Sequence, residues 1–207
     1  MRRGSPFYTS EPALADRTRL LNDDLSRRFP GLLEPSSHPA LRLKSDQITG
    51  RGVFLADGAT VPRDEPLAVY FGEVILGPAD GEYVMELRRF RQLGRSFDLA
   101  IDAGPYCRRA NPSPGNVALF NHACLDRTVE LRYLPELALP CVVAYPSPAL
   151  RGGQELRFSY DGGLRSGPYT IDPPGRYQLV ADGVASVPCA CRRPAPCPRG
   201  RWMRIFS

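Results

Sequence analysis

Residues 116–124 read Asn-Val-Ala-Leu-Phe-Asn-His-Ala-Cys, and this stretch decides the fold. An apolar run over 117–120 leads directly into Asn121, His122 and then Cys124. Because the run is apolar enough to be buried, we expect Asn121 and His122 to enter the interior, where their polar atoms need hydrogen-bond partners. The stretch therefore predicts a buried polar site with a thiol beside it.

The composition favours a mostly β chain with many loops. The 207 residues include 22 prolines and 19 glycines, and 43% of them are hydrophobic. This size suits one domain with appendages, or at most two small domains. No apolar run is long enough to span a membrane, and no apolar signal core follows the basic residues 1–4. We therefore expect a reducing compartment, where clustered cysteines favour metal binding over disulfides.

The net charge of +5 comes almost entirely from arginine, since Lys44 is the only lysine. Much of the excess lies beyond Asp182, the last acidic residue, in Arg192, Arg193, Arg199, Arg201 and Arg204. Such a basic tail suits contact with nucleic acid or another polyanion. A solubilising terminus explains the same charge, and the composition leaves both readings open.

Local patterns predict one helix and several short strands. The helix is expected over 13–29, with one face formed by Leu14, Leu20, Leu21, Leu25 and Phe29. Gly50 and Gly52 are expected to form a tight turn, and 103–115 a loop. Strands are expected over 41–44, 53–56, 67–75, 97–102, 130–133, 141–145 and 154–161.

Four blocks, in this order, resemble a SET-domain protein lysine methyltransferase with a post-SET zinc motif. Residues 50–54 (GRGVF) resemble the family's Gly-x-Gly-Val-Phe block, and 70–75 (YFGEVI) its Tyr-x-Gly-Glu strand. Residues 115–124 resemble the block written GNVARFINHSC, and 153–161 the block written GEELTFDY. A terminal Cys-x-Cys follows at 189–191.

The resemblance implies a mostly β fold of several small sheets with a pseudoknot, short helices and a C-terminal zinc tail. It implies four regions: an N-terminal extension over 1–40, a SET domain over 41–161, a connector over 162–188 and a post-SET zinc motif over 189–207. The implied activity is S-adenosylmethionine-dependent methylation of a protein lysine, with a histone as the implied substrate.

Site residues follow from the same resemblance, position by position. Tyr160 is the implied catalytic tyrosine, with Tyr70 beside it. The implied substrate channel is lined by Phe158, Tyr70 and Trp202. The implied cofactor contacts are Gly50, Arg51, Gly52, Tyr83, Asn121 and His122. Without the four blocks, the aromatic residues would be read as ordinary core and His122 as a satisfied core histidine.

A structural zinc ion is implied by the cysteines. Cys189, Cys191 and Cys197 supply three thiolates, which leave a tetrahedral site incomplete. In the family the cysteine of the Asn-His block completes it, which here is Cys124. Zinc would then order the tail. Cys107 and Cys141 are not expected to be ligands.

The chain departs from the family pattern at several points, including Leu119 in place of an arginine and Gln154 in place of a glutamate. These departures keep two alternatives open: a catalytically weak or inactive SET-like module that binds cofactor or peptide, and a basic zinc-containing binder of nucleic acid. The expected substrate is a histone tail or another basic protein, with a nucleic-acid contact through the C-terminal arginines and no membrane. The expected location is the nucleus or chromosome in a eukaryote, and otherwise the cytoplasm.

Overall fold

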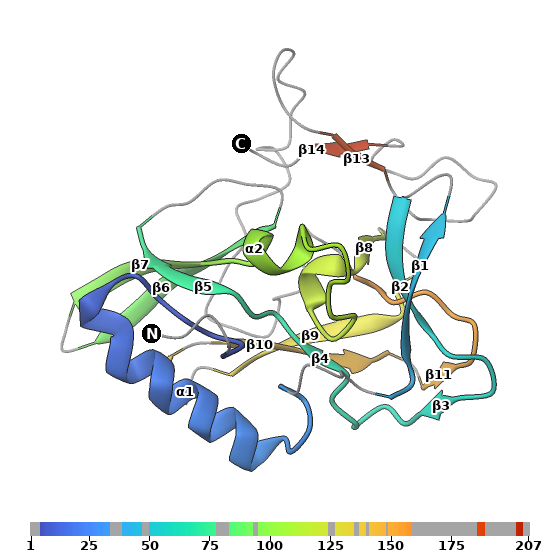
Figure 1. The fold of residues 1–207 in the computed structure, drawn as a ribbon, viewed down its shortest axis with the longest axis horizontal. Helices are drawn as coiled ribbons and strands as arrows, with labels where there is room; N and C mark the ends of the chain where they lie inside the picture. The colour runs from blue at the N-terminus through green and yellow to red at the C-terminus, as the bar shows by residue number, and fades with distance from the viewer. Residues whose placement is uncertain are drawn as a thin grey trace.

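Small β-sheets make up most of the regular structure. A computed structural model of the chain describes residues 5–33, 39–46, 50–77, 83–92, 95–123, 127–134, 137–139, 141–147, 149–158, 186–188 and 202–204. Within these ranges the fold is mostly β with few helices, as the sequence predicts (Figure 1). No helix in these ranges is both long and apolar enough to cross a membrane.

The strands pair into sheets of two or three. The three-stranded sheets have the orders β4–β10–β9 and β5–β7–β6, and the other pairs are β1–β2, β3–β11, β8–β12 and β13–β14. The elements are η1 (Pro12–Leu14), α1 (Ala15–Arg28), β1 (Leu41–Asp46), β2 (Gly50–Leu55), β3 (Thr60–Val61), β4 (Ala68–Val69), β5 (Glu73–Leu76), β6 (Val84–Gln92), β7 (Arg95–Asp102), α2 (Gly104–Cys107), η2 (Val117–Leu119), β8 (Asn121–His122), β9 (Val129–Leu134), β10 (Cys141–Pro146), β11 (Leu150–Arg151), β12 (Arg157–Phe158), β13 (Ser186–Pro188) and β14 (Trp202–Arg204).

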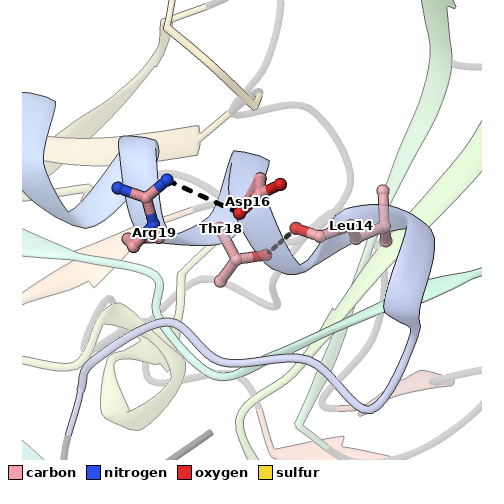
Figure 2. Close-up of polar contacts among 4 residues, drawn as sticks. All are labelled: Leu14, Asp16, Thr18 and Arg19. Atoms are coloured by element: carbon pink, nitrogen blue, oxygen red, sulfur yellow. Dashed lines mark hydrogen bonds and ion pairs between the residues drawn. The ribbon is translucent and has the colours of Figure 1, made fainter.

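Helix α1 confirms the predicted helix and most of its predicted apolar face. Leu14, Leu21 and Leu25 are buried as expected, whereas Leu20 is 45% exposed, so its assignment to the apolar face was wrong. Thr18 is fully buried in that face instead. Its hydroxyl donates to the Leu14 carbonyl at 2.9 Å, which satisfies the polar group inside the core (Figure 2).

The solvent side of α1 is held by local charge pairs. Arg19 Nη2 lies 3.5 Å from Asp16 Oδ1 one turn earlier, with both side chains well exposed (Figure 2). Asp16 in the first turn, and Arg27 and Arg28 in the last, also complement the helix dipole. An exposed pair of this kind contributes at most about 0.5 kcal/mol, so burial of the apolar face dominates.

Three further local expectations are corrected by the structure. Gly50–Gly52 is not a tight turn but the start of β2, where all three residues pair with β1. The loop expected over 103–115 contains the short helix α2. The single strand expected over 67–75 is split into β4 and β5.

Gly72, between β4 and β5, lies in close contact with the end of β7. A Cβ atom there would lie 2.2 Å from the Asp102 carbonyl oxygen. The chain thus passes directly against the end of β7 as it crosses from the β4–β10–β9 sheet to the β5–β7–β6 sheet. Only glycine allows so close a backbone approach.

The N-terminal segment is joined to the β5–β7–β6 sheet. Tyr8 forms an isolated parallel bridge with Glu73, the first residue of β5. The Val74 amide donates to the Tyr8 carbonyl at 2.8 Å, and the Thr9 hydroxyl donates to the Val74 carbonyl at 2.6 Å. Phe7 is almost fully buried. This segment therefore covers an edge of the sheet that would otherwise expose unpaired backbone groups.

Candidate functional site

The site begins with a short parallel pairing between two distant segments. In β8 and β12, Asn121 is opposite Arg157 and His122 is opposite Phe158. The Ala123 amide extends the pairing by donating to the Phe158 carbonyl at 2.9 Å. The Asn-His block and the strand that leads toward Tyr160 therefore lie side by side.

Strand β2 meets the same region through backbone hydrogen bonds on either side of Glu155. The Leu55 amide donates to the Gln154 carbonyl, and the Leu156 amide donates to the Val53 carbonyl, both at 2.8 Å. Phe54 and Glu155 form an antiparallel bridge between these bonds. Three segments, around residues 52, 121 and 155, thus converge.

At their meeting point lies a contact between two polar side chains. Asn121 Nδ2 donates to Glu155 Oε1 at 2.7 Å. A Cβ atom at Gly52 would lie 2.6 Å from Asn121 Nδ2 and 2.8 Å from Glu155 Oε1. Gly52 therefore leaves the space that the Asn121–Glu155 pair occupies, and any larger residue would displace it.

Thr128 holds the backbone of Glu155 and Arg157 through hydrogen bonds. Its hydroxyl donates to the Glu155 carbonyl at 2.7 Å and accepts from the Arg157 amide at 2.8 Å. The Thr128 amide also donates to the Arg157 carbonyl at 3.0 Å. These bonds are buried, so losing the hydroxyl would leave polar backbone groups unpaired inside the protein.

Asn116, at the start of the opening stretch, is a structural residue. It is 1% exposed, and its Nδ2 donates to the Phe71 carbonyl at 3.0 Å. Its Oδ1 accepts from the Ala118 amide at 3.1 Å and so caps η2. The apolar run after it is buried at Val117, Leu119 and Phe120, which confirms the predicted burial of this run.

Tyr70 is enclosed by neighbouring segments. It is 4% exposed, and its amide donates to the Val142 carbonyl of β10 at 2.9 Å. On the preceding residue, the Val69 amide donates to the Gly115 carbonyl at 3.2 Å. Tyr70 therefore belongs to the core of the fold, next in sequence to a backbone contact with the segment that leads into η2.

Helix α2 links Arg51 and Tyr83. Arg51 Nη2 donates to the Cys107 carbonyl at the end of this helix, at 2.5 Å. The Arg108 guanidinium lies over the Tyr83 ring, 5.6 Å from its centroid, and the Ala103 amide donates to the Tyr83 carbonyl. These contacts were not predicted from the sequence, because residues 103–115 were expected to form a loop without a helix.

A second aromatic cluster lies between the N-terminal segment and α2. Tyr106 contacts Phe71 edge-on at 5.1 Å and Tyr8 at 5.8 Å, and its hydroxyl donates to the Ser5 carbonyl at 2.5 Å. Burial, and then Tyr8, raises the pKa of Tyr106 to about 12, against the opposing charge of Arg109. This cluster was also missed by the sequence analysis.

Two of the sequence departures, Leu119 and Gln154, fall at positions outside the polar contact. Leu119 is buried in the core, so its apolar side chain suits its surroundings. Gln154 lies on an exposed turn, where its Oε1 accepts from the Arg151 amide at 2.6 Å. The carboxylate that contacts Asn121 belongs to the next residue, Glu155. This contact was not predicted from the sequence.

The predicted site residues are described to different extents. Gly52, Asn121 and the backbone of His122 and Phe158 come together, whereas Arg51 contacts Cys107 and Tyr83 contacts Arg108, both at the end of α2. Gly50 has φ +75° at the start of β2. Trp202 is described by its backbone, paired with Pro188. The residues that lie outside the described ranges are Tyr160, Cys124, Cys189, Cys191 and Cys197.

Metal ligands are not grouped in the part of the chain that the structure describes. No cluster of three or more His, Cys, Asp or Glu side chains able to hold a metal ion occurs among those residues. Cys107 and Cys141, which do fall within it, are buried and form no disulfide. The predicted four-cysteine site thus stays a prediction.

Comparisons with known proteins find structural likeness only. No protein-family model and no curated protein matches the sequence. Among solved structures, the chain is similar to KRYPTONITE in complex with mCHH DNA, H3(1-15) peptide and SAH, with 21% identity and a TM-score of 0.49 over 80% of this chain and 29% of that one.

Two further structures give comparable values. KRYPTONITE in complex with mCHG DNA and SAH has 20% identity and a TM-score of 0.44, over 80% of this chain and 29% of that one. The methyltransferase domain of human histone-lysine N-methyltransferase SETMAR has 15% identity and a TM-score of 0.48, over 78% of this chain and 57% of that one. The chain therefore spans under a third of the KRYPTONITE chains and just over half of the SETMAR domain.

Proposed function

We propose that this chain is a SET-domain protein-lysine N-methyltransferase that uses S-adenosylmethionine. The observation that carries the proposal is the meeting of Gly52, Asn121 and Glu155, because three of the four resemblance blocks supply one residue each. A chance collection of local motifs gives no reason for these residues to converge. The β8–β12 pairing adds the backbone of His122 and Phe158.

The residues around this contact fit a small polar cofactor. Gly52 is buried against the Asn121 amide and the Glu155 carboxylate, so it allows the amide to lie close to the β2 backbone. Asn121 is only partly buried, and its amide offers both a donor and an acceptor. We assign Gly50, Gly52, Asn121 and the backbone of His122 to cofactor binding, with Arg51 and Tyr83 at its edge.

When bound, S-adenosylmethionine supplies an electrophilic sulfonium methyl group, which a neutral lysine amine can accept directly. The protein has to align the two reactants and keep the amine uncharged. An aromatic, poorly hydrated channel disfavours the charged ammonium and lowers its pKa. We assign Tyr70, Phe158 and Trp202 to this channel, and Tyr160 as the group that orients the amine through its hydroxyl.

The proposal extends to the metal and the substrate. Four thiolates suit a structural zinc ion, so Cys124, Cys189, Cys191 and Cys197 are proposed to bind one zinc together. The proposed substrate is a histone tail or another basic protein. The C-terminal arginines are proposed to contact nucleic acid near that substrate.

The test is methyl transfer from isotope-labelled S-adenosylmethionine to histones and to lysate proteins. We expect label in protein with the wild-type chain, and a fall of about 100-fold or more with Tyr160→Phe, on the scale of losing a positioned catalytic group. The product S-adenosylhomocysteine should bind both forms equally. Tyr133→Phe, which removes a hydroxyl from β9, is the matched control and should transfer normally.

The other outcomes separate the alternatives. A wild-type protein that binds S-adenosylhomocysteine but labels nothing is a binding module. One that binds neither S-adenosylmethionine nor S-adenosylhomocysteine contradicts the proposed function altogether. Loss of both binding and transfer in Tyr160→Phe would contradict the orienting role of Tyr160.

A further inference from the structure

We propose that Glu155 is a positioning residue, whose carboxylate fixes the amide of Asn121 in the orientation that the cofactor requires. The inference rests on the proposed function of this site. Its basis is the 2.7 Å hydrogen bond from Asn121 Nδ2 to Glu155 Oε1, between residues 34 positions apart in the chain. The resemblance assigns no such role to Glu155.

The burial of Glu155 is the first reason to assign it a role. It is 5% exposed, and glutamate is rarely buried to this extent unless it is paired. Its neighbour Gln154, by contrast, is exposed and bonds the Arg151 backbone. Of the two adjacent side chains, only that of Glu155 reaches Asn121.

The backbone of Glu155 is held from two directions. Its carbonyl accepts from the Thr128 hydroxyl at 2.7 Å. The amide of the next residue, Leu156, donates to the Val53 carbonyl at 2.8 Å. Because the backbone is anchored to β2 and to Thr128, the carboxylate points into the space beside Gly52.

A carboxylate opposite an amide selects one of its two orientations. An ionised carboxylate only accepts hydrogen bonds, so it attracts Asn121 Nδ2 and repels Asn121 Oδ1. A 180° rotation of the amide would place two oxygen atoms against each other. Glu155 therefore keeps Oδ1 turned away from itself, where it can accept a hydrogen bond from a ligand.

Steric confinement strengthens this selection. With a hypothetical Cβ at Gly52 only 2.6 Å from Asn121 Nδ2 and 2.8 Å from Glu155 Oε1, both side chains lie close against the β2 backbone. Neither has room to adopt a distant rotamer on that side. Confinement and charge thus fix the orientation of the Asn121 amide before a ligand binds, which reduces the entropic cost of binding.

The experiment measures S-adenosylhomocysteine binding by titration calorimetry, together with thermal unfolding of the free protein. Glu155→Met removes the acceptor while keeping the length of the side chain, and we expect Kd to rise about tenfold, as when a residue that orients a ligating side chain is lost. Glu155→Gln retains an amide oxygen that still accepts from Asn121, so its Kd should stay within about threefold of wild type. Gln154→Met, at the exposed neighbour, is the matched control and should bind normally.

A purely structural role predicts a different pattern. Glu155→Met would then lower the unfolding temperature but leave Kd unchanged, and that outcome overturns the inference. Wild-type protein without affinity for S-adenosylhomocysteine would instead overturn the proposed function itself, so the two failures are distinguishable.

A second pair of variants decides the matter if Glu155→Met does not fold. Asn121→Asp places two carboxylates face to face, and we expect a clear fall in the unfolding temperature. Adding Glu155→Gln restores a donor opposite an acceptor and should recover most of that fall, together with part of the affinity for S-adenosylhomocysteine that Asn121→Asp loses. Recovery of the unfolding temperature without any recovery of affinity would overturn the inference. Additive effects of the two substitutions would show that the side chains do not act as a pair, and would overturn the inference.

Discussion

At the scale of single residues, Gly52 sets the steric condition of the candidate site. A Cβ atom on this residue would lie within 3.0 Å of both the amide nitrogen of Asn121 and a carboxylate oxygen of Glu155. Contacts below 3.0 Å from a Cβ atom require something to move, and both neighbours are hydrogen-bonded to each other. A substitution here therefore acts on the polar pair rather than on backbone strain.

Gly52→Ala is expected to weaken cofactor binding and to destabilise the fold. Overpacking of this kind typically lowers the free energy of unfolding by about 1–3 kcal/mol. We expect S-adenosylhomocysteine to bind at least about tenfold more weakly, in line with a displaced polar contact worth about 1.4 kcal/mol. Calorimetry and urea unfolding measure the two effects separately.

Gly58→Ala is a suitable control for Gly52→Ala. Gly58 has open space at its Cβ position but a φ of +76°, so alanine there introduces backbone strain without displacing a neighbour. It should lower stability and leave the ligand affinity unchanged. Equal losses of affinity in the two variants would refute the steric role of Gly52.

At the scale of elements, the N-terminal segment is pinned between β5 and α2. Tyr106 on α2 contacts both Tyr8 and Phe71, and its hydroxyl donates to the Ser5 carbonyl. Arg109 lies over the Tyr106 ring, 4.5 Å from its centroid. The neutral phenol is the form that can donate this hydrogen bond, so the attachment depends on its proton.

The raised pKa of Tyr106 predicts a loss of stability at alkaline pH. Its value rises from 10.0 to about 12 on folding, mainly through burial, so the folded state holds the phenol proton more tightly than the unfolded state. The resulting contribution to stability is fully present below pH 10 and disappears as pH rises toward 12. Urea unfolding at neutral pH and near the upper end of this range measures the fall.

Tyr106→Phe should show a smaller alkaline fall than the wild-type chain, because this proton is no longer linked to folding. Tyr133→Phe keeps Tyr106 and should retain the full fall, which controls for loss of a tyrosine elsewhere. Identical pH profiles for wild type and Tyr106→Phe would argue against a protonated phenol in the attachment.

The elements predicted correctly from the sequence were those with a clear hydrophobic pattern in neighbouring residues. β9 and β10 were anticipated to within a residue or two, because alternation and an apolar run are properties of adjacent residues. Thr18 was missed on the buried face of α1, because hydropathy favours Leu20 and does not include the bond to the Leu14 carbonyl. Gly50–Gly52 was read as a turn, because pairing with β1 is not visible locally.

The polar contact itself was beyond reach of any local pattern. Asn121 was expected to find a hydrogen-bond partner, but that partner is 34 residues away and brought near by the β8–β12 register. Register follows from the packing of whole segments, on which the sequence of either strand alone carries little information. The buried glutamate of the 153–161 block was the one available signal.

At the scale of the whole molecule, the proposed zinc would connect the central site to the C-terminal tail. Cys124 follows β8 by two residues, and the other three proposed ligands lie beyond residue 188. We expect one zinc per chain by elemental analysis. Cys124→Ser should lose most of this zinc, because three thiolates leave a tetrahedral site incomplete.

Cys141→Ser supplies the matched control for the metal. Cys141 is buried on β10 and forms no disulfide, and its substitution should leave the zinc content unchanged. Full retention of zinc in Cys124→Ser would exclude this cysteine from the site.

The separation between Asn121 and Glu155 also has a meaning during biosynthesis. A nascent chain that has been extended through the Asn-His block still lacks the partner of Asn121, because Glu155 follows 34 residues later. At about 5–20 residues per second, the ribosome needs roughly 2–7 seconds to add them. During that interval the site lacks Glu155, so a ligand that requires the oriented Asn121 amide cannot bind. Such a ligand therefore cannot help the growing chain to fold.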